Sequence, residues 1–237
     1  MMDKYKRIVF FTGAGISVES GIPTYRGAGG VWKKYNYQDY ACQEAFLRDP
    51  EKVWDFHDQR RAMIKSCEPN LAHRIIAVIQ SRQPKTSIIT QNIDGLHQRA
   101  GADKVIELHG SIWRLRSPDS IIENFETPLQ ERKCGQNAWW RPDIIWFGDS
   151  LNQETINLAL QALKKCDLLI CIGTSAVVYP AARMPEIAIN NGAYTIEINP
   201  EPTPISHLFQ RCMRDSASNA LSSLFPGFAE AASRIER

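Results

Sequence analysis

The sequence predicts an α/β fold: a Rossmann-like parallel sheet with helices on both faces, plus a small inserted domain. The first observation is that continuous apolar runs, rich in β-branched residues, recur between turn residues. They lie at 7–12, 86–90, 104–108, 143–147, 167–173 and 193–199. Because these runs do not alternate with polar residues, they predict strands that are buried on both faces, as in parallel sheets.

Helical patterns between these runs are the second observation. They lie at about 50–66, 70–82, 94–100, 152–165 and 180–191. Strands that alternate with helices are typical of a doubly wound α/β sheet.

Two regions that break this alternation are the third observation. Residues 22–82 contain a glycine-rich loop and then helices with no strand between them, and residues 111–141 are irregular and contain two prolines. We interpret both regions as insertions that together form the small domain. The prediction is one unit over 1–237, with a Rossmann-like core at about 1–25, 83–112 and 142–237 and a small domain at about 26–82 and 113–141.

Composition argues against several classes of protein. The 237 residues carry 28 Lys and Arg against 26 Asp and Glu, a net charge of +2, without a run of five basic residues, so we expect no nucleic-acid partner. No apolar stretch approaches the roughly 18 residues that cross a bilayer, so we expect no membrane association. The first apolar run enters a glycine loop rather than a signal-peptide cleavage site, which predicts a cytoplasmic protein. None of the six cysteines is spaced as C-x-x-C, and we expect a monomer without disulfides.

Polar clusters follow the predicted strands at their carboxyl ends. The glycine-rich stretch 12–27 would let the backbone approach a pyrophosphate, although an ordinary strand-to-helix turn is the alternative. Gln91, Asn92 and Asp94 follow the next strand, where open α/β sheets place ligands. The alternative for Asp94 is a cap on the following helix.

Three further clusters complete the predicted edge. His109 follows the 104–108 strand and is either a general base or a core residue. Residues 172–180 and 198–202 offer backbone, hydroxyl and amide groups after the last two strands. Five polar clusters on the same edge of one sheet favour a shared ligand site.

In order, these stretches resemble the sirtuin family of NAD-dependent protein deacylases. The matching motifs are GAGIS, GIPTYRG, QNIDGLH, ELHGS, RPDIIWFGD, GTSAVVYPAA and INPEPTP. The stretches 26–32 and 53–61 are similar to the class III subgroup, which includes bacterial deacylases and desuccinylases. The resemblance implies a large Rossmann-like domain with a small helical and zinc-binding module.

The resemblance also implies roles for individual residues. The implied catalytic residues are His109 as general base, Asn92 and Asp94. The implied NAD site contains Gly13, Ala14, Gly15, Glu19, Tyr25, Arg26, Trp32, Gln91, Asn92, Ile93, Asp94, Gly173, Thr174, Ser175 and Asn199. An acyl-lysine peptide would add as a strand between 146–149 and 176–179. The implied substrate residues are His57, Arg60, Trp146, Phe147, Gly148, Val178 and Tyr179.

The zinc module departs from the family pattern. Sirtuins usually hold a structural zinc with two C-x-x-C pairs, and structural zinc needs four such ligands. Here Ser117, Ser120, Glu131 and Cys134 stand at these positions. We therefore expect no structural zinc, and a remnant of the module that packing and hydrogen bonds hold in place.

The acyl pocket also departs. Sirtuins that prefer acidic acyl groups carry Tyr-x-x-Arg on a helix, a spacing that puts both side chains on one face. The positions here are His57 and Arg60, and Arg60 could bind a succinyl or malonyl carboxylate through two hydrogen bonds. Asp58 could raise the positive character of His57 or compete for Arg60, and Ala28 fits a roomier pocket. The alternative is a solvated helix face.

The activity that the resemblance implies is NAD-dependent removal of an acyl group from lysine. The products are nicotinamide, O-acyl-ADP-ribose and free lysine. Two alternatives stay open, a mono-ADP-ribosyltransferase and a catalytically weak sensor that binds NAD or acyl-lysine. The missing zinc ligands favour a sensor, whereas His109 favours an enzyme, because a binding module needs no general base.

Overall fold

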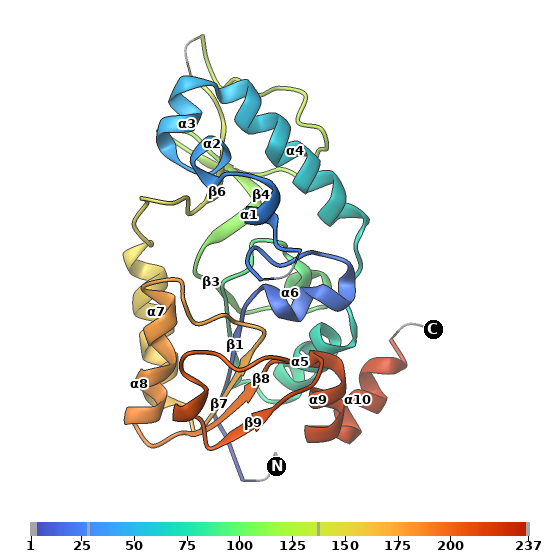
Figure 1. The fold of residues 1–237 in the computed structure, drawn as a ribbon. Helices are drawn as coiled ribbons and strands as arrows, with labels where there is room; N and C mark the ends of the chain where they lie inside the picture. The colour runs from blue at the N-terminus through green and yellow to red at the C-terminus, as the bar shows by residue number, and fades with distance from the viewer. Residues whose placement is uncertain (1–3, 28, 137, 236–237) are drawn as a thin grey trace.

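The structure is a computed structural model, and it describes residues 4–27, 29–136 and 138–235. Ala28 lies outside the described residues. Figure 1 shows a larger lower part built on a sheet and a smaller upper part of helices and strands. None of the described helices combines the length and the apolar character that crossing a membrane requires.

A six-stranded parallel sheet forms the lower part, in the order β3-β2-β1-β7-β8-β9. Its strands are β1 (Ile8–Thr12), β2 (Ser87–Thr90), β3 (Val105–Glu107), β7 (Leu168–Ile172), β8 (Tyr194–Ile198) and β9 (Arg211–Met213). Five of the six predicted strands are confirmed here. The prediction missed β9, because this edge strand is largely exposed and lacks an apolar run.

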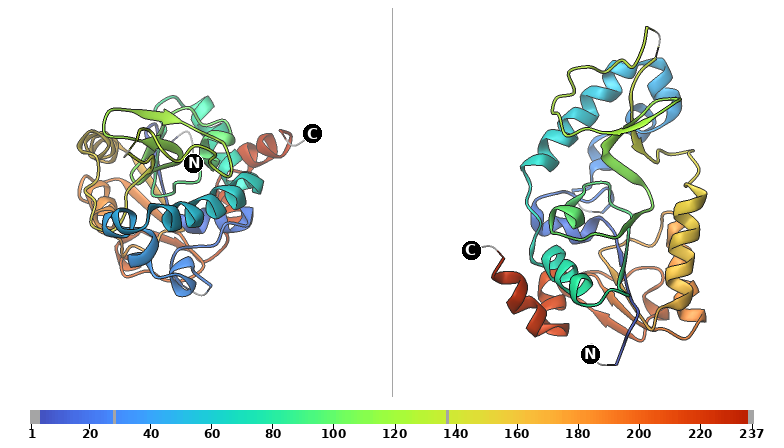
Figure 2. Two further views of the ribbon diagram at one scale, coloured as in Figure 1. Left: turned by 90° about the horizontal axis from the view of Figure 1, so that it is seen from above. Right: turned by 180° about the vertical axis from the view of Figure 1, so that it is seen from behind.

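Both faces of this sheet are covered, as the continuous apolar runs predicted. Phe10 and Phe11 are adjacent in β1, point to opposite faces and enter two separate cores. The helices on one face are α5 (Leu71–Arg82), α9 (Ala217–Leu224) and α10 (Pro226–Ser233), and those on the other are α7 (Gln153–Lys165) and α8 (Met184–Asn190). Figure 2 shows, from behind, α7 and α10 on opposite sides of the molecule.

Side-chain caps start the longer helices. Asp49 accepts a hydrogen bond from Lys52 N (3.0 Å) at the start of α4 (Pro50–Ser66), where proline occupies the first turn. Asn70 and Asn152 cap α5 and α7 in the same way. Shorter helical turns are η1 (Ala14–Ser20), α1 (Val31–Lys34), α2 (Tyr37–Tyr40), α3 (Gln43–Arg48), α6 (Leu96–Arg99), η2 (Ala181–Arg183) and η3 (Ser206–Leu208).

The upper part contains a second sheet that the sequence did not predict. Its antiparallel order is β5-β4-β6, from β4 (Gly110–Arg116), β5 (Ile121–Glu123) and β6 (Arg141–Ile144). Two predictions are therefore wrong: the 111–141 region is not irregular throughout, and the 143–147 run is not a strand of the parallel sheet. That run is apolar because Ile144 and Trp146 pack with Phe46 and Trp54 of α3 and α4. The division into two domains stays a prediction.

Candidate active site

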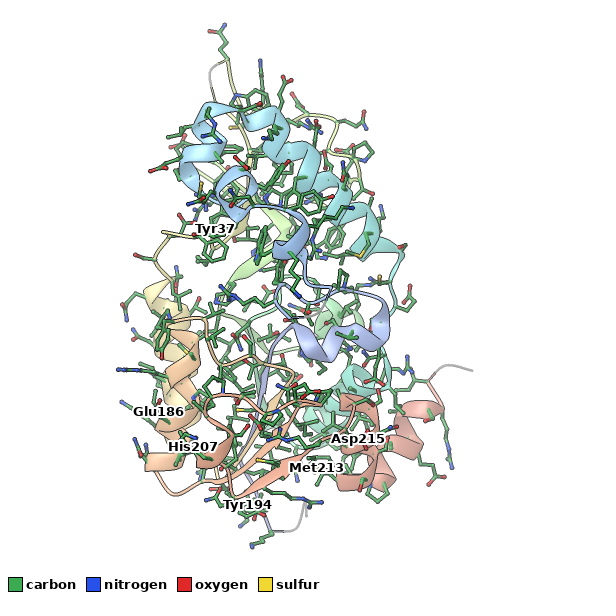
Figure 3. The ribbon with its side chains drawn as sticks, in the orientation of Figure 1. Tyr37, Glu186, Tyr194, His207, Met213 and Asp215 are labelled. Atoms are coloured by element: carbon green, nitrogen blue, oxygen red, sulfur yellow. The ribbon has the colours of Figure 1, made fainter. Side chains whose placement is uncertain are left out.

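A large cavity, about 780 Å³ in volume, lies at the carboxyl edge of the parallel sheet. Its walls come from loops that follow β1, β2, β7 and β8, and from α4 and the segment after β6. Figure 3 shows Asp215, which borders the cavity, in the lower part. His57 and Arg60 border the same cavity from α4, which lies in the upper part. The cavity therefore lies where the two parts meet.

Every predicted site residue except Asp94 borders this cavity. On the predicted cofactor side these are Gly13, Ala14, Gly15, Glu19, Tyr25, Arg26, Trp32, Gln91, Asn92, Ile93, Gly173, Thr174, Ser175 and Asn199. On the predicted substrate side they are His57, Arg60, Trp146, Phe147, Gly148, Val178 and Tyr179, and His109 borders the same space. Their contacts with ligands stay predictions.

Glycines allow two of the loops to touch. Gly15 N donates to Gly173 O (2.9 Å), and a Cβ atom on Gly15 would lie 2.5 Å from Gly173 Cα. Gly173 has a positive φ of 61°, a backbone conformation that residues with a side chain rarely adopt. The loops after β1 and β7 therefore form a closely packed backbone surface, which leaves a pyrophosphate free to approach without meeting side chains.

Thr174 joins the other loops of the edge. Its hydroxyl accepts from Gln91 Nε2 (2.9 Å), and its carbonyl accepts from Asn199 Nδ2 (2.9 Å). The loops after β2, β7 and β8 are thus held together at one buried residue.

His109 is oriented for proton transfer. Its Nδ1 lies 2.9 Å from the carbonyl oxygen of Gln91. Because a carbonyl only accepts hydrogen bonds, Nδ1 carries the proton and Nε2 keeps its lone pair. Burial lowers the pKa of His109, and the hydrogen bond to Gln91 partly opposes this. The imidazole is therefore neutral near pH 7 and able to accept a proton.

Asp94 lies apart from the large cavity. It borders a neighbouring recess of about 10 Å³, together with Asn92 and Arg60. Its carboxylate accepts from Leu96 N (2.9 Å) and from Ser17 Oγ (2.8 Å), and burial raises its pKa. The contact with Leu96, two residues on, is an Asx turn, whereas the N-cap of α6 is Gly95 and has no side-chain hydrogen bond.

Arg60 is a buried cation beside the cavity. Its guanidinium lies 5.0 Å from the centroid of the Tyr25 ring, and its exposed fraction is 8%. Among the described residues no carboxylate forms an ion pair with it. The charge of Arg60 partly opposes the raised pKa of Asp94, which borders the same recess, but these two described side chains form no ion pair. The guanidinium donors of Arg60 are therefore suited to an anionic ligand.

His57 is buried and neutral. It stacks on Trp146 with ring centroids 5.9 Å apart, and neither ring nitrogen has a hydrogen-bond partner in the described part of the chain. Burial, and next the charge of Arg60, lower the pKa of His57 to about 3. The solvated helix face considered as an alternative is therefore wrong.

Asp58 plays neither of the parts expected of it. Its carboxylate binds Arg132 (2.7 Å) and accepts from Leu129 N (3.0 Å). It therefore neither charges His57 nor competes for Arg60. Asp58 instead ties α4 to the segment that precedes β6.

The positions aligned with zinc ligands form two hydrogen-bonded turns. Ser117 N donates to Ser120 O (2.8 Å), and the two hydroxyls lie 3.0 Å apart. Cys134 N donates to Ala138 O (3.0 Å) in the second turn. The residues that the structure describes contain no group of three or more His, Cys, Asp or Glu placed to hold a metal ion. This donor set does not fit structural zinc.

Arg61 of α4 organises the same region from inside. It is fully buried, and its guanidinium donates to the carbonyl oxygens of Ile112 (2.5 Å), Asn124 (2.9 Å) and Glu126 (2.8 Å). These bonds join β4 to the segment after β5. The sequence did not predict this role of Arg61, because the charge of Arg61 suggested an exposed helix face.

Part of the cavity wall was also not predicted from the sequence. Residues 203–204 and 215–217 border it, the latter at the start of α9. Glu19 reaches this helix start, where its carboxylate accepts from Ser216 Oγ (3.2 Å) and Ser218 N (3.0 Å). The pairing of β8 with the unpredicted β9 brings this segment to the edge, so local sequence carried little signal for it.

Comparison with known proteins places this geometry in a family. Residues 13–180 match the profile described as the Sir2 family. The chain belongs to the Sir2 family. An "NAD-dependent protein deacylase" of Aquifex aeolicus (strain VF5) is 44% identical over 225 residues, which covers 92% of this chain and 93% of the relative.

Solved structures of the Sir2 family share the fold. A mutant Sir2 homologue in complex with ADP-ribose is 37% identical, with a TM-score of 0.90 and coverage of 97% of this chain and 94% of that chain. A Sir2 mutant with a deacetylated peptide and 3′-O-acetyl ADP-ribose is 30% identical, with a TM-score of 0.85 and coverage of 96% and 95%. These likenesses confirm the predicted Rossmann-like fold and support the use of NAD.

Proposed function

We propose that the protein is an NAD-dependent protein-lysine deacylase that releases nicotinamide, O-acyl-ADP-ribose and free lysine. The observation that carries this proposal is the orientation of His109, whose Nδ1 donates to Gln91 O so that a basic Nε2 remains at the cavity. Family membership and the name of the Aquifex relative point to the same reaction. A sensor or reader has no use for a base held in this way.

NAD would enter as the second substrate along the carboxyl edge of the sheet. The paired glycine loops at Gly15 and Gly173 leave room for its pyrophosphate, since any Cβ there would collide with backbone. Gln91 and Asn199, both fixed through Thr174, would contact its ribose groups. Bound NAD supplies an electrophilic ribose carbon once nicotinamide leaves.

His109 would act as the general base of the reaction. The acyl carbonyl oxygen of the substrate attacks the ribose carbon as nicotinamide leaves. His109 then accepts a proton through the ribose hydroxyls, so that a ribose oxygen attacks the carbon of the resulting imidate. Addition of water then releases free lysine and O-acyl-ADP-ribose. The neutral state of His109 near pH 7 meets this need, because only the unprotonated imidazole can accept a proton.

The acyl-lysine peptide would add to the 146–149 segment as a strand. Phe147 N donates to Ala41 O (3.0 Å), and Arg141 binds the carboxylate of Asp149. Trp146 N donates to the same carboxylate (3.0 Å). The segment is therefore held from the upper part, which supports its use as a rigid platform for a peptide backbone.

A mass-spectrometric time course tests the proposal. Purified protein is incubated with NAD and one lysine peptide in acetyl and succinyl forms. Matching release of deacylated peptide and O-acyl-ADP-ribose is expected. Transfer of the ADP-ribose label onto protein would instead indicate an ADP-ribosyltransferase, and NAD binding without turnover would indicate a sensor.

Arg60 would select acidic acyl groups. We expect Arg60→Gln to lower kcat/KM for a succinyl peptide by about 10–100-fold, as hydrogen bonds to charged groups contribute roughly 1.5–3 kcal/mol. The acetyl peptide should be nearly unaffected, because it places no charge near Arg60. Arg48→Gln, at an exposed arginine, is the matched control. Equal losses with both peptides would show that Arg60 has no part in acyl selection.

The protein would fold without structural zinc. Asp58 and Arg61 hold the segment that zinc organises in other sirtuins, through hydrogen bonds to Leu129 N and to three backbone carbonyls. We expect dialysis against EDTA to leave Tm and activity unchanged. Removal of a structural zinc would lower the free energy of unfolding by about 10 kcal/mol or more. Stoichiometric zinc in tag-free protein would contradict this expectation.

The protein would act on acyl-lysine proteins as a cytoplasmic monomer, without nucleic-acid or membrane partners. The net charge of +2 supports the lack of a nucleic-acid partner.

A further inference from the structure

Trp113 is a buried residue of β4 that reaches from the upper part to the loop after β2. Its exposed fraction is 6%, and its indole N–H donates to the backbone carbonyl of Asp94 (2.7 Å). It does not border the large cavity, and the proposed reaction gives it no role. The resemblance to sirtuins implies that Gln91, Asn92 and Asp94 hold the nicotinamide ribose and carboxamide of NAD. Trp113 therefore contacts a residue of the expected nicotinamide site.

The turn beneath Trp113 has a demanding backbone. Gly95 has a positive φ of 75°, and a Cβ atom there would lie 2.9 Å from Cδ1 of the indole. The ring therefore packs directly against the Asp94–Gly95 backbone. This contact and the indole hydrogen bond act together on the position of Asp94.

Hydrogen bonds connect Asp94 through Ser17 to Asn92 in the cavity wall. Its carboxylate accepts from Ser17 Oγ (2.8 Å), and Ser17 Oγ accepts from Asn92 Nδ2 (3.2 Å). Asn92 borders both the large cavity and the small recess beside Asp94. A shift of the Asp94 backbone would therefore move the side chains that line the recess.

The other surroundings of Trp113 belong to α4 and to the segment in place of the zinc module. Phe125 stacks on the indole with ring centroids 5.7 Å apart and an angle of 27°. The Arg61 guanidinium lies 5.3 Å from the ring centroid and donates to Ile112 O and Asn124 O. Contacts within the upper part therefore hold the indole ring of Trp113, which also contacts Asp94.

We propose that Trp113 is a positioning residue for nicotinamide binding, acting through Asp94 and not on the substrate itself. The inference rests on the proposed use of NAD. The recess beside Asp94 has room for about one water molecule, so a nicotinamide ring enters only when the lining residues move. Trp113 holds Asp94 and Gly95 in place, through its N–H and its ring, while the other lining residues adjust.

Calorimetric titration with NAD and with ADP-ribose tests the inference, because ADP-ribose lacks the nicotinamide ring. Trp113→Phe keeps an aromatic ring but removes the N–H donor. We expect its Kd for NAD to rise about 3–10-fold, the loss of roughly one neutral hydrogen bond. Its Kd for ADP-ribose should stay unchanged.

Trp54→Phe is the matched control. Trp54 is also buried, and its indole N–H also donates to a backbone carbonyl at 2.7 Å, that of Trp140. Trp54→Phe should lower Tm to a similar extent as Trp113→Phe. It should leave the Kd for NAD and the Kd for ADP-ribose unchanged. A Trp113→Phe protein that binds NAD as the wild type does, or that loses NAD and ADP-ribose equally, would overturn the inference.

The titration is independent of turnover. A wild-type protein that binds NAD but removes no acyl group would refute the proposed function and leave the inference on Trp113 to be decided by the variants. A wild-type protein that binds neither NAD nor ADP-ribose would overturn both.

Discussion

Replacement of His109 by alanine is expected to lower the rate of acyl removal by about 10²–10⁴-fold, the usual contribution of a positioned general base. The variant should still bind NAD, because the glycine loops and Thr174 remain in place. Steady-state kinetics and calorimetry with NAD measure the two effects separately.

The same residue predicts the acid limb of the pH profile. Burial lowers the pKa of His109 below its ordinary value of 6.5, so the imidazole is neutral at pH 7 and becomes protonated only in more acidic solution. Because the protonated form cannot accept a proton, kcat/KM should fall as pH decreases through that lowered pKa. It should not change through protonation of His109 above pH 7.

His207→Ala is the control for these measurements, since His207 is exposed and is not among the residues that line the cavity. It should retain the rate and the pH profile of the wild type. Full acyl removal by His109→Ala would refute the role of His109 as base and would leave the proposed mechanism without a proton acceptor.

Replacement of Gly15 by alanine should have the second large effect. The new Cβ atom would lie 2.5 Å from Gly173 Cα and 2.8 Å from Gly173 O, both backbone atoms that cannot rotate away. The loops after β1 and β7 would have to separate. We expect a loss of about 1–3 kcal/mol in the free energy of unfolding and a roughly 10²-fold lower kcat/KM for NAD, since small displacements of a site have effects of this size.

Gly227→Ala is the matched control for Gly15→Ala. Gly227 lies in α10, where a Cβ atom meets nothing within 4 Å. The free energy of unfolding of this variant should rise by about 0.5–1 kcal/mol, because alanine loses less conformational entropy than glycine when a helix forms. Urea unfolding and NAD titration distinguish the two variants. Wild-type NAD affinity in Gly15→Ala would show that the close contact of the loops is not needed for the cofactor.

Continuous apolar runs were enough to predict most of the parallel sheet. β1 and β7 consist of buried residues on both faces, so burial alone identified them. The run at 143–147 misled the prediction for the same reason. Sequence shows that a segment is buried, but the buried neighbours of β6 are helices α3 and α4 and not the parallel sheet.

The candidate site divides in a similar way. The order of polar clusters placed His109, Gln91 and Thr174 on one edge, because carboxyl ends of parallel strands meet there. The state of each side chain came only from contacts across the fold. The carbonyl of Gln91 determines which nitrogen of His109 is basic. Burial makes His57 neutral, although its neighbours in the chain are charged.

Local sequence thus determined which strands form, which residues reach the edge of the sheet and which family the motifs resemble. Tertiary structure decided that Arg60 forms no ion pair with a carboxylate of the described residues, that Arg61 and Asp58 join α4 to the segment lacking zinc ligands, and that Trp113 contacts Asp94. The physical reason is range: strand burial follows from neighbours along the chain, whereas pairing of buried polar groups joins residues 18 to 71 positions apart, which no local pattern encodes.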